Sequence, residues 1–190
     1  MGVNVLEHSI RIFKKEQQGV MTMEFKDIVR SIVEVHKELS AQASRAVNLS
    51  ITLRNWLIGC HIAVYELNGA DRAAYGERML SKLSEELQKL NVSSVGKRQL
   101  YHYLKLYQTY PQIVRSLPAQ LVQSLPAGAF ELDEKVRSLT ALSGIDPINI
   151  LNRLSYTHIE QLLALEDAAM RIFYEVECIQ GNWSVRVFAA

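Results

Sequence analysis

The chain has 190 residues, of which 48% are hydrophobic and 22% are charged. These values are typical of globular proteins and argue against disorder, and a chain of this length buries a sizeable core without disulfides or a structural metal. Twenty-one Lys and Arg residues against 20 Asp and Glu residues give a net charge of +1. The chain as a whole therefore has no field that would draw it to nucleic acid or to an anionic membrane, and any such affinity must come from a local patch.

The cysteine content and the N-terminal sequence favour the cytoplasm. Cys60 and Cys178 make neither a disulfide framework nor a metal-ligand pattern. The first residues lack the apolar stretch of a signal peptide, and the most apolar run, residues 55–65, is too short to span a bilayer. We therefore expect a cytoplasmic protein with reduced thiols, and we expect no membrane partner, no cofactor and no metal site.

Residues 1–20 carry mixed charge and few apolar side chains, so we expect a mobile lead-in. Residues 21–112 instead show apolar side chains at helical spacings, which predicts a helical bundle. The first stripe comprises Phe25, Ile28, Val29, Ile32, Val33, His36 and Leu39. The second stripe comprises Leu49, Leu53, Trp56, Leu57, Cys60, Ala63, Val64 and Leu67, widened by Ile51, Ile58 and Ile62. This second stretch is apolar on most sides, so we expect it to be central, with Trp56 buried and with an end at Asn68-Gly69.

Two more helices follow, separated by a short polar break at residues 91–94. Asp71 opens the first of them, and its apolar stripe comprises Gly76, Met79, Leu80, Leu83, Leu87 and Leu90. Ser94 is the predicted N-cap of the second. The inner face of that second helix comprises Leu100, Tyr103, Leu104 and Tyr107. Pro111 ends it, because the residue before a proline is disfavoured in a helix.

The charge is distributed unevenly along the chain. Residues 91–130 contain no Asp or Glu but four basic residues, which leaves 17 basic and 20 acidic residues, a net of −3, elsewhere. The outward face of the helix after the break is a candidate nucleic-acid-binding site and comprises Lys97, Arg98, Tyr101, His102, Lys105 and Gln108. A helix, a short break and a basic, aromatic helix make the outline of a helix-turn-helix, in which basic side chains contact phosphates while Tyr101 and Gln108 reach base edges or sugars. The alternatives are a solvent-exposed bundle helix that happens to lack acids, and a docking surface for a protein.

Residues 113–153 differ in composition from the preceding helices and are predicted to be a Pro-containing connection. They hold three of the four prolines, and the stretch VRSLPAQL is followed at once by VQSLPAGA. A short helix is expected near residues 133–142. Glu131, Asp133, Glu134 and Lys135 include the residue types of metal-dependent phosphodiester hydrolysis, but without a strand to support them we do not expect a metal site there.

Residues 154–190 are predicted to form a helical hairpin that packs on the same domain. Thr157 to Glu160 reads as a capping box, and Asp167 opens a second helix that ends at Gly181. Met170, Phe173 and Tyr174 are expected to face inward. The run from Leu162 to Asp167 and the later Ser184 to Arg186 are similar to the helix-turn-helix segment of ParB-like proteins. No segment alternates with a period of two, so the fold class is all-α with a helix-turn-helix-like element.

No enzyme signature is present in the sequence. There is no Gly-rich phosphate loop, HExxH, GxSxG or paired CxxC, and the five histidines stand far apart. Carboxylates such as Glu175 and Glu177 are interpreted as parts of solvated helix faces. We therefore predict no catalytic residues.

Several short stretches together resemble the N-terminal domain of YhcG-like proteins. They comprise Ala46–Asn48, Arg54–Gly59, Tyr75-Gly76 with Leu80 and Leu83, Leu154–His158 with Leu162 and Leu163, Arg171, Phe173-Tyr174 and Asn182–Arg186. The resemblance implies an all-helical domain that binds DNA or self-associates and stands ahead of a PD-(D/E)XK nuclease domain, in or near restriction–modification or other DNA-processing systems. The carboxylates and lysine of such a nuclease have no counterpart here, so the chain is either a natural short form or a truncated gene.

The prediction is a non-catalytic, DNA-associated helical module that self-associates and belongs to a YhcG-like nuclease-type system. Its expected partners are DNA, a second copy of the chain, and a nuclease domain or restriction–modification proteins. One alternative is a protein-interaction or dimerisation bundle without nucleic-acid binding, and another is an enzyme with its own active site. Structural or interface roles are predicted for Arg54, Asn55, Trp56 and Trp183.

Overall fold

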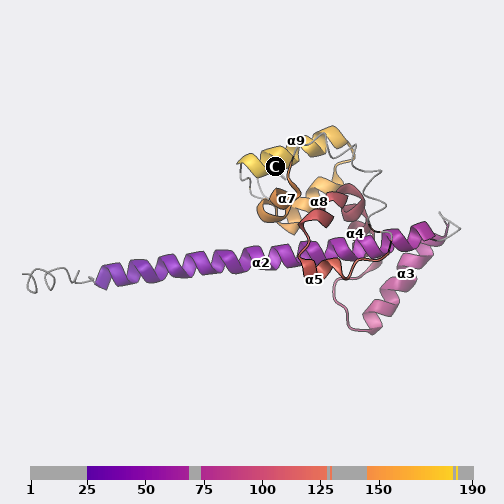
Figure 1. The fold of residues 1–190 in the computed structure, drawn as a ribbon, viewed down its shortest axis with the longest axis horizontal. Coiled ribbons are helices and arrows are strands. Elements are labelled where there is room, and N and C mark those ends of the chain that lie inside the picture. The colour runs from indigo at the N-terminus through magenta and orange to yellow at the C-terminus, as the bar shows by residue number, and fades with distance from the viewer. Residues whose placement is uncertain (1–24, 69–73, 128, 130–144, 182, 184–190) are drawn as a thin grey trace, which may run out of the picture. The chain divides into compact units, whose positions relative to one another are not determined.

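The computed structural model describes residues 25–68, 74–127, 129, 145–181 and 183 (Figure 1). The chain divides into two compact units, residues 1–44 and 45–190. All regular secondary structure in the described residues is helical, which confirms the predicted all-α fold class. The predicted lead-in at residues 1–20, the expected short helix near 133–142 and the acidic run at 131–135 lie outside the described residues.

The longest helix is α2, Phe25–Asn68, which begins in the first unit and ends in the second. Its end at Asn68 is the predicted one. In the first unit its apolar stripe is solvent-exposed, with Phe25, Ile32 and Leu39 at 79%, 62% and 59% exposure. In the second unit much of the predicted central stripe is buried, including Leu53 and Cys60, whereas Leu49, Leu57 and Ile58 are half-buried and Ile51 is exposed. One helix thus carries an exposed apolar face in one unit and a core-forming face in the other.

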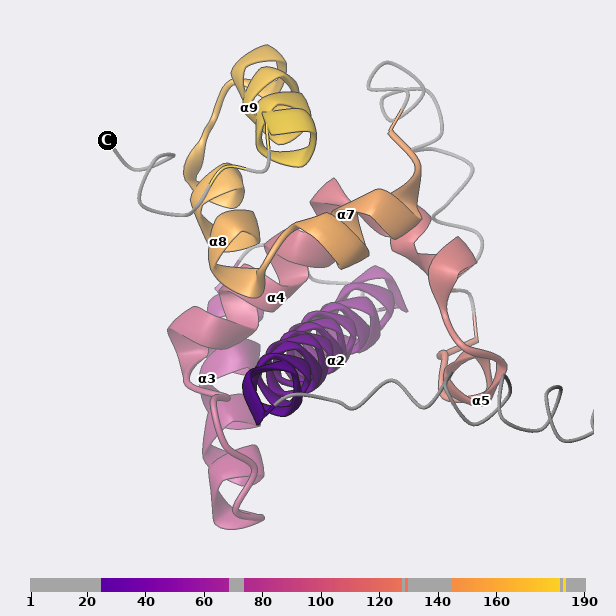
Figure 2. The same ribbon diagram turned by 90° about the vertical axis from the view of Figure 1, so that its left-hand side faces the viewer.

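The other described helices all belong to the second unit. In chain order they are α3 Ala74–Lys89, α4 Lys97–Thr109, the 3-10 helix η1 Pro111–Ser116, α5 Ala119–Val122, α7 Pro147–Arg153, α8 Tyr156–Ala164 and α9 Ala168–Gly181. Helix α4 packs against α3 and α8, and α9 packs against α7 and α8. Figure 2 shows α4 between the second-unit part of α2 and the α7–α8 pair. Helix α4 is therefore held from several sides.

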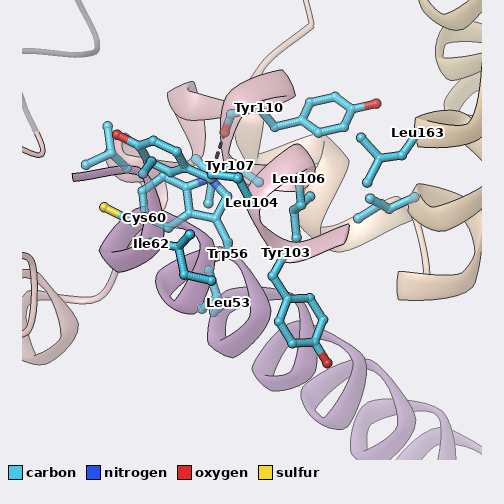
Figure 3. Close-up of a cluster of buried hydrophobic side chains, with 14 of the residues drawn as sticks. Leu53, Trp56, Cys60, Ile62, Tyr103, Leu104, Leu106, Tyr107, Tyr110 and Leu163 are labelled. Atoms are coloured by element: carbon cyan, nitrogen blue, oxygen red, sulfur yellow. Dashed lines mark hydrogen bonds between the residues drawn. The ribbon is translucent and has the colours of Figure 1, made fainter. Parts of the chain in front are cut away.

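Trp56 lies at the centre of the core and is completely buried (Figure 3). Its indole Nε1–H donates a 2.8 Å hydrogen bond to the backbone carbonyl of Tyr110. Its ring lies 5.0 Å from the ring of Tyr107, tilted by 59°. Such tilted aromatic pairs contribute beyond the area that they bury. Trp56 thereby joins α2 to both the body and the end of α4.

A close approach of two helix backbones occurs at Gly59. A methyl group built at Gly59 would overlap the backbone carbonyl of Tyr103. Only a residue without a side chain allows α2 and α4 to pack at this distance. Gly59 therefore sets how closely α4 lies against α2.

Two of the predicted helix caps are wrong. Helix α4 begins at Lys97 with Gly96 as its N-cap, and Ser94 instead has a φ of +57°. An N-cap residue takes extended dihedral angles, so a left-handed Ser94 cannot serve as one. The cap of α8 is Ser155 rather than Thr157, because the helix begins at Tyr156. The Ser155 hydroxyl accepts a hydrogen bond from the His158 backbone N–H, and His158 Nδ1 accepts one from the Ser155 backbone N–H.

The predicted inward face of α9 is wrong for Met170 and Phe173, whereas Tyr174 packs against the core as predicted. Met170 and Phe173 are exposed and Tyr174 is half-buried, whereas the buried residues are Glu175 and Cys178. The predicted start of the helix agrees with the structure, since the Asp167 carboxylate accepts hydrogen bonds from the backbone N–H groups of Ala169 and Met170.

Candidate nucleic-acid interface

The inner face of α4 fixes the direction in which its outer face points. Its buried residues are Leu100, Tyr103, Leu104, Leu106 and Tyr107, which include the four predicted from the sequence. Five large side chains on a helix of 13 residues form a wide apolar face that contacts α2, α3 and α8. The opposite face is left to carry the charged and polar residues.

The turn that leads into α4 is anchored at two consecutive carbonyl groups. The Arg54 guanidinium donates a 2.7 Å hydrogen bond to the Ser93 carbonyl and a 2.9 Å hydrogen bond to the Asn55 side-chain oxygen. The Tyr103 hydroxyl donates a 2.7 Å hydrogen bond to the Ser94 carbonyl. Arg54 and Tyr103 together hold the turn between α3 and α4, so the N-terminus of α4 is positioned by both α2 and α4 itself.

The structure brings the six candidate residues together on the outer side of one helix. Lys97, Arg98, Tyr101 and Gln108 are exposed, whereas His102 and Lys105 are half-buried. The ring of Tyr101 lies edge-on to that of His102 at 6.4 Å. The Nδ1 atom of His102 is buried and has no hydrogen-bond partner among the described residues. His102 is therefore less accessible to an external ligand than the four exposed members of the set.

The N-terminal end of α4 is electrostatically positive. No side chain caps it, and its first turn contains no acidic residue. The first backbone N–H groups of a helix have no intrahelical partner, and they carry the positive end of the helix dipole. Lys97 and Arg98 add two positive charges at the same end. This combination is chemically suited to an anionic group such as a phosphate.

Sequence reasoning missed Glu175, which it placed on a solvated face. Glu175 is 3% exposed, and its carboxylate accepts a 3.1 Å hydrogen bond from the Tyr110 hydroxyl. Burial raises the pKa of Glu175, although the Tyr110 hydrogen bond and the charge of Arg171 act in the opposite direction. The sequence feature that could have indicated burial of Glu175 is Cys178, an apolar residue three positions later on the same face of α9, which is buried as well.

The side chains of Glu175 and Trp56 are both hydrogen-bonded to Tyr110. Tyr110 accepts a hydrogen bond from Trp56 at its backbone carbonyl and donates one to Glu175 from its hydroxyl. This residue directly follows α4, so the bonds tie the end of α4 to α2 on one side and to α9 on the other. The buried carboxylate is thus part of the support of α4.

The other predicted structural residue, Trp183, is half-buried beyond the end of α9. Its backbone carbonyl lies 3.0 Å from His158 Nε2. Because His158 Nδ1 accepts the hydrogen bond from the Ser155 backbone N–H, Nε2 is the nitrogen that donates to Trp183. His158 therefore links the start of α8 to Trp183.

In the described residues, His, Cys, Asp and Glu side chains are the candidate metal ligands, and the cysteine thiols are candidate nucleophiles. They contain no group of three or more His, Cys, Asp and Glu side chains that could hold a metal ion. Burial raises the pKa of the Cys60 thiol to about 11, so the thiol is neutral and is not an activated nucleophile. None of the described helices has both the length and the apolar character needed to cross a membrane.

Comparison with known proteins agrees with the resemblance seen in the sequence. The chain is 27% identical over 172 residues to the Escherichia coli (strain K12) protein named "Putative nuclease YhcG", and this match covers 87% of the chain and 44% of that protein. The chain thus spans less than half the length of this relative. No solved structure matches the chain. The DUF1016 N-terminal domain family matches residues 29–190, and the chain belongs to this family.

Proposed function

We propose that the chain is a non-catalytic DNA-associated module of a nuclease-type protein or system and that it contacts DNA through the outer face of α4. The observation that carries this proposal is the exposed row of Lys97, Arg98, Tyr101 and Gln108 on a helix within a stretch free of acidic residues. The relative named as a nuclease supports it, because a nuclease acts on nucleic acid.

The chemistry of the row fits a duplex. Lys97 and Arg98 stand beside the uncapped start of α4, where a phosphate would also meet backbone N–H groups. Lys97 and Gln108 are eleven residues apart, a rise of roughly 16 Å along the helix, whereas the major groove is about 12 Å wide. The row is therefore long enough to carry a phosphate contact at one end while Tyr101 and Gln108 reach sugars or base edges.

The test is a mobility-shift titration of duplex DNA across a salt series. Replacing Lys97, Arg98 and Lys105 by Gln should weaken binding at low salt and flatten the slope of log affinity against log salt by about 2–3, because each lost phosphate contact contributes roughly 0.9. The matched control replaces Lys82, Lys89 and Arg153, which are exposed and lie outside both α4 and residues 25–39, by Gln and removes the same charge. An unchanged slope in the α4 variant, or an equal change in the control, would contradict the proposal.

Self-association is the second function that we propose, and a separate observation supports it. The first-unit part of α2 exposes Phe25, Ile28, Val29, Ile32, Val33, Val35 and Leu39. Large contiguous apolar patches on soluble proteins usually mark interaction sites. The expected observation is a mass above that of the monomer in sedimentation equilibrium at tens of micromolar, and a monomer mass would contradict it.

A further inference from the structure

The exposed stripe of α2 is centred on Ile32. At about 100° per residue, Phe25 and Leu39 lie within about 20° of Ile32 around the helix axis, and Ile28, Val29 and Val35 lie within about 60°. All five of these side chains are exposed, along with Ile32 itself. Residues 25–39 therefore present a largely apolar face that runs along about 21 Å of helix, and His36, about 40° from Ile32, is the polar side chain within it.

The charged residues of this stretch all lie away from the stripe. They are Lys26, Asp27, Arg30, Glu34, Lys37 and Glu38. By the same geometry each lies about 120° or more from Ile32 around the axis. The face can therefore be covered by another helix without burying a Lys, Arg, Asp or Glu side chain, as in the seam of a helical pair.

The sequence of these charges is reversed in sign about Ile32. Counting outward from Ile32 in the two directions, Arg30 corresponds to Glu34, and each more distant charge also corresponds to its opposite. The remaining pairs are Asp27 with Lys37 and Lys26 with Glu38. The apolar residues show the same symmetry at two of three pairs, since Phe25 corresponds to Leu39 and Val29 to Val35, whereas Ile28 corresponds to His36.

This symmetry favours a second copy of the chain as the partner, in the antiparallel orientation. Two copies of residues 25–39, aligned antiparallel with a two-fold axis at Ile32, place opposite charges at the same level along the pair. The same alignment places Phe25 opposite Leu39, Val29 opposite Val35, and Ile28 opposite His36. A parallel pair aligned in register would place like charges at the same level. A two-fold interface uses the same patch on both subunits, so a self-complementary stripe is the feature that it requires.

The two kinds of residue have different roles in such a pair. The charges lie on the outer sides of the helices and are screened by solvent, so each such exposed pair contributes little to affinity. Affinity must come from the apolar stripe, whereas the charges bias the direction. The stretch also carries three basic and three acidic residues, so its neutrality argues against nucleic acid as the occupant of this face.

We infer that two copies of the chain pair antiparallel through residues 25–39 of α2, with the two-fold axis at Ile32. This inference rests on the self-association proposed above and names the surface that would produce it.

Disulfide trapping tests the orientation. The Phe25→Cys and Leu39→Cys variants are oxidised separately and as an equimolar mixture, and the native Cys60 and Cys178 are both buried. We expect the mixture to give a Phe25→Cys to Leu39→Cys crosslink several-fold above the homodimer of either variant. The control is Ala41→Cys, on the opposite side of the helix, which should give only background. Preferential Phe25→Cys homodimers would indicate a parallel pair, and background crosslinking throughout would also overturn the inference.

Sedimentation equilibrium tests the surface. Ile32→Glu places a charge at the centre of the stripe and should raise the dimer dissociation constant at least tenfold, whereas Ala41→Glu adds the same charge on the opposite side and should leave it unchanged. Circular dichroism checks that both variants keep their helix content. A wild-type monomer would overturn both the self-association and this surface. A wild-type dimer that Ile32→Glu does not weaken would overturn only the surface, and self-association would then use another face.

Discussion

Truncation of Trp56 is the sharpest perturbation of the scaffold that positions α4. The side chain is completely buried, contacts the Tyr107 ring and donates a hydrogen bond to the Tyr110 carbonyl. Replacing a buried Trp by Ala costs about 3–5 kcal/mol through lost burial and the cavity that remains. The Tyr110 carbonyl also loses its indole donor, and an unsatisfied buried group costs about 1–3 kcal/mol. We therefore expect Trp56→Ala to lose at least about 4 kcal/mol of unfolding free energy.

A second variant separates the two contributions. Trp56→Phe keeps most of the apolar volume but removes the indole N–H, so its loss should be about 1–3 kcal/mol. Chemical denaturation followed by circular dichroism at 222 nm measures both variants. The central position of Trp56 is refuted if the unfolding free energy of Trp56→Ala lies within about 1 kcal/mol of that of the wild type. It is also refuted if Trp56→Phe loses as much unfolding free energy as Trp56→Ala.

Three further predictions follow from other parts of the structure. Gly59→Ala should destabilise the protein by about 1–3 kcal/mol or more in the same assay, because the added methyl group meets a backbone carbonyl rather than a flexible side chain. An unchanged free energy of unfolding would refute the close approach of α2 and α4. Burial raises the pKa of Glu175, so the folded state favours the neutral form of this side chain. The stabilisation of the wild type by neutral Glu175 is fully present below the unfolded pKa and is lost as pH rises through the folded pKa. The stability of Glu175→Gln relative to the wild type should therefore increase as pH rises above about 4.5, the usual pKa of a glutamate, and a constant difference would contradict the shift. The purified chain should not cleave plasmid DNA in Mg²⁺ or Mn²⁺, and cleavage that survives repurification but disappears in a variant of a single Asp or Glu would show an active site.

The spacing of apolar residues predicted the helices better than it predicted their ends. Leu100 and Tyr103 are buried as the inner face of α4 requires, since a wide stripe specifies one side of a helix. The caps depend on the dihedral angles of single residues. Ser94 carries the right side chain for a cap but lies in the left-handed region, and Ser155 acts with a histidine in place of the usual Glu or Gln. Residue type alone does not contain this information.

Tertiary contacts explain what the sequence could not supply at the candidate site. Arg54 and Asn55 were open to either a structural or a surface role, and the hydrogen bond from Arg54 to Ser93 becomes visible only when α2 lies beside the turn. Glu175 was assigned to solvent because carboxylates are rarely buried. Its burial depends on the hydroxyl of Tyr110, a residue 65 positions away in the chain.

The contact between α4 and DNA is tested most directly by photocrosslinking from two positions of matched exposure. Tyr101 on α4 is 56% exposed and Phe173 on α9 is 57% exposed. Each is replaced in turn by p-benzoylphenylalanine, and the protein is irradiated with labelled duplex DNA at low salt. The proposed function predicts a crosslink from position 101 that disappears as salt is raised, and only background from position 173. A chain that shifts DNA but crosslinks equally from both positions, or only from position 173, would contradict the assignment of DNA binding to α4.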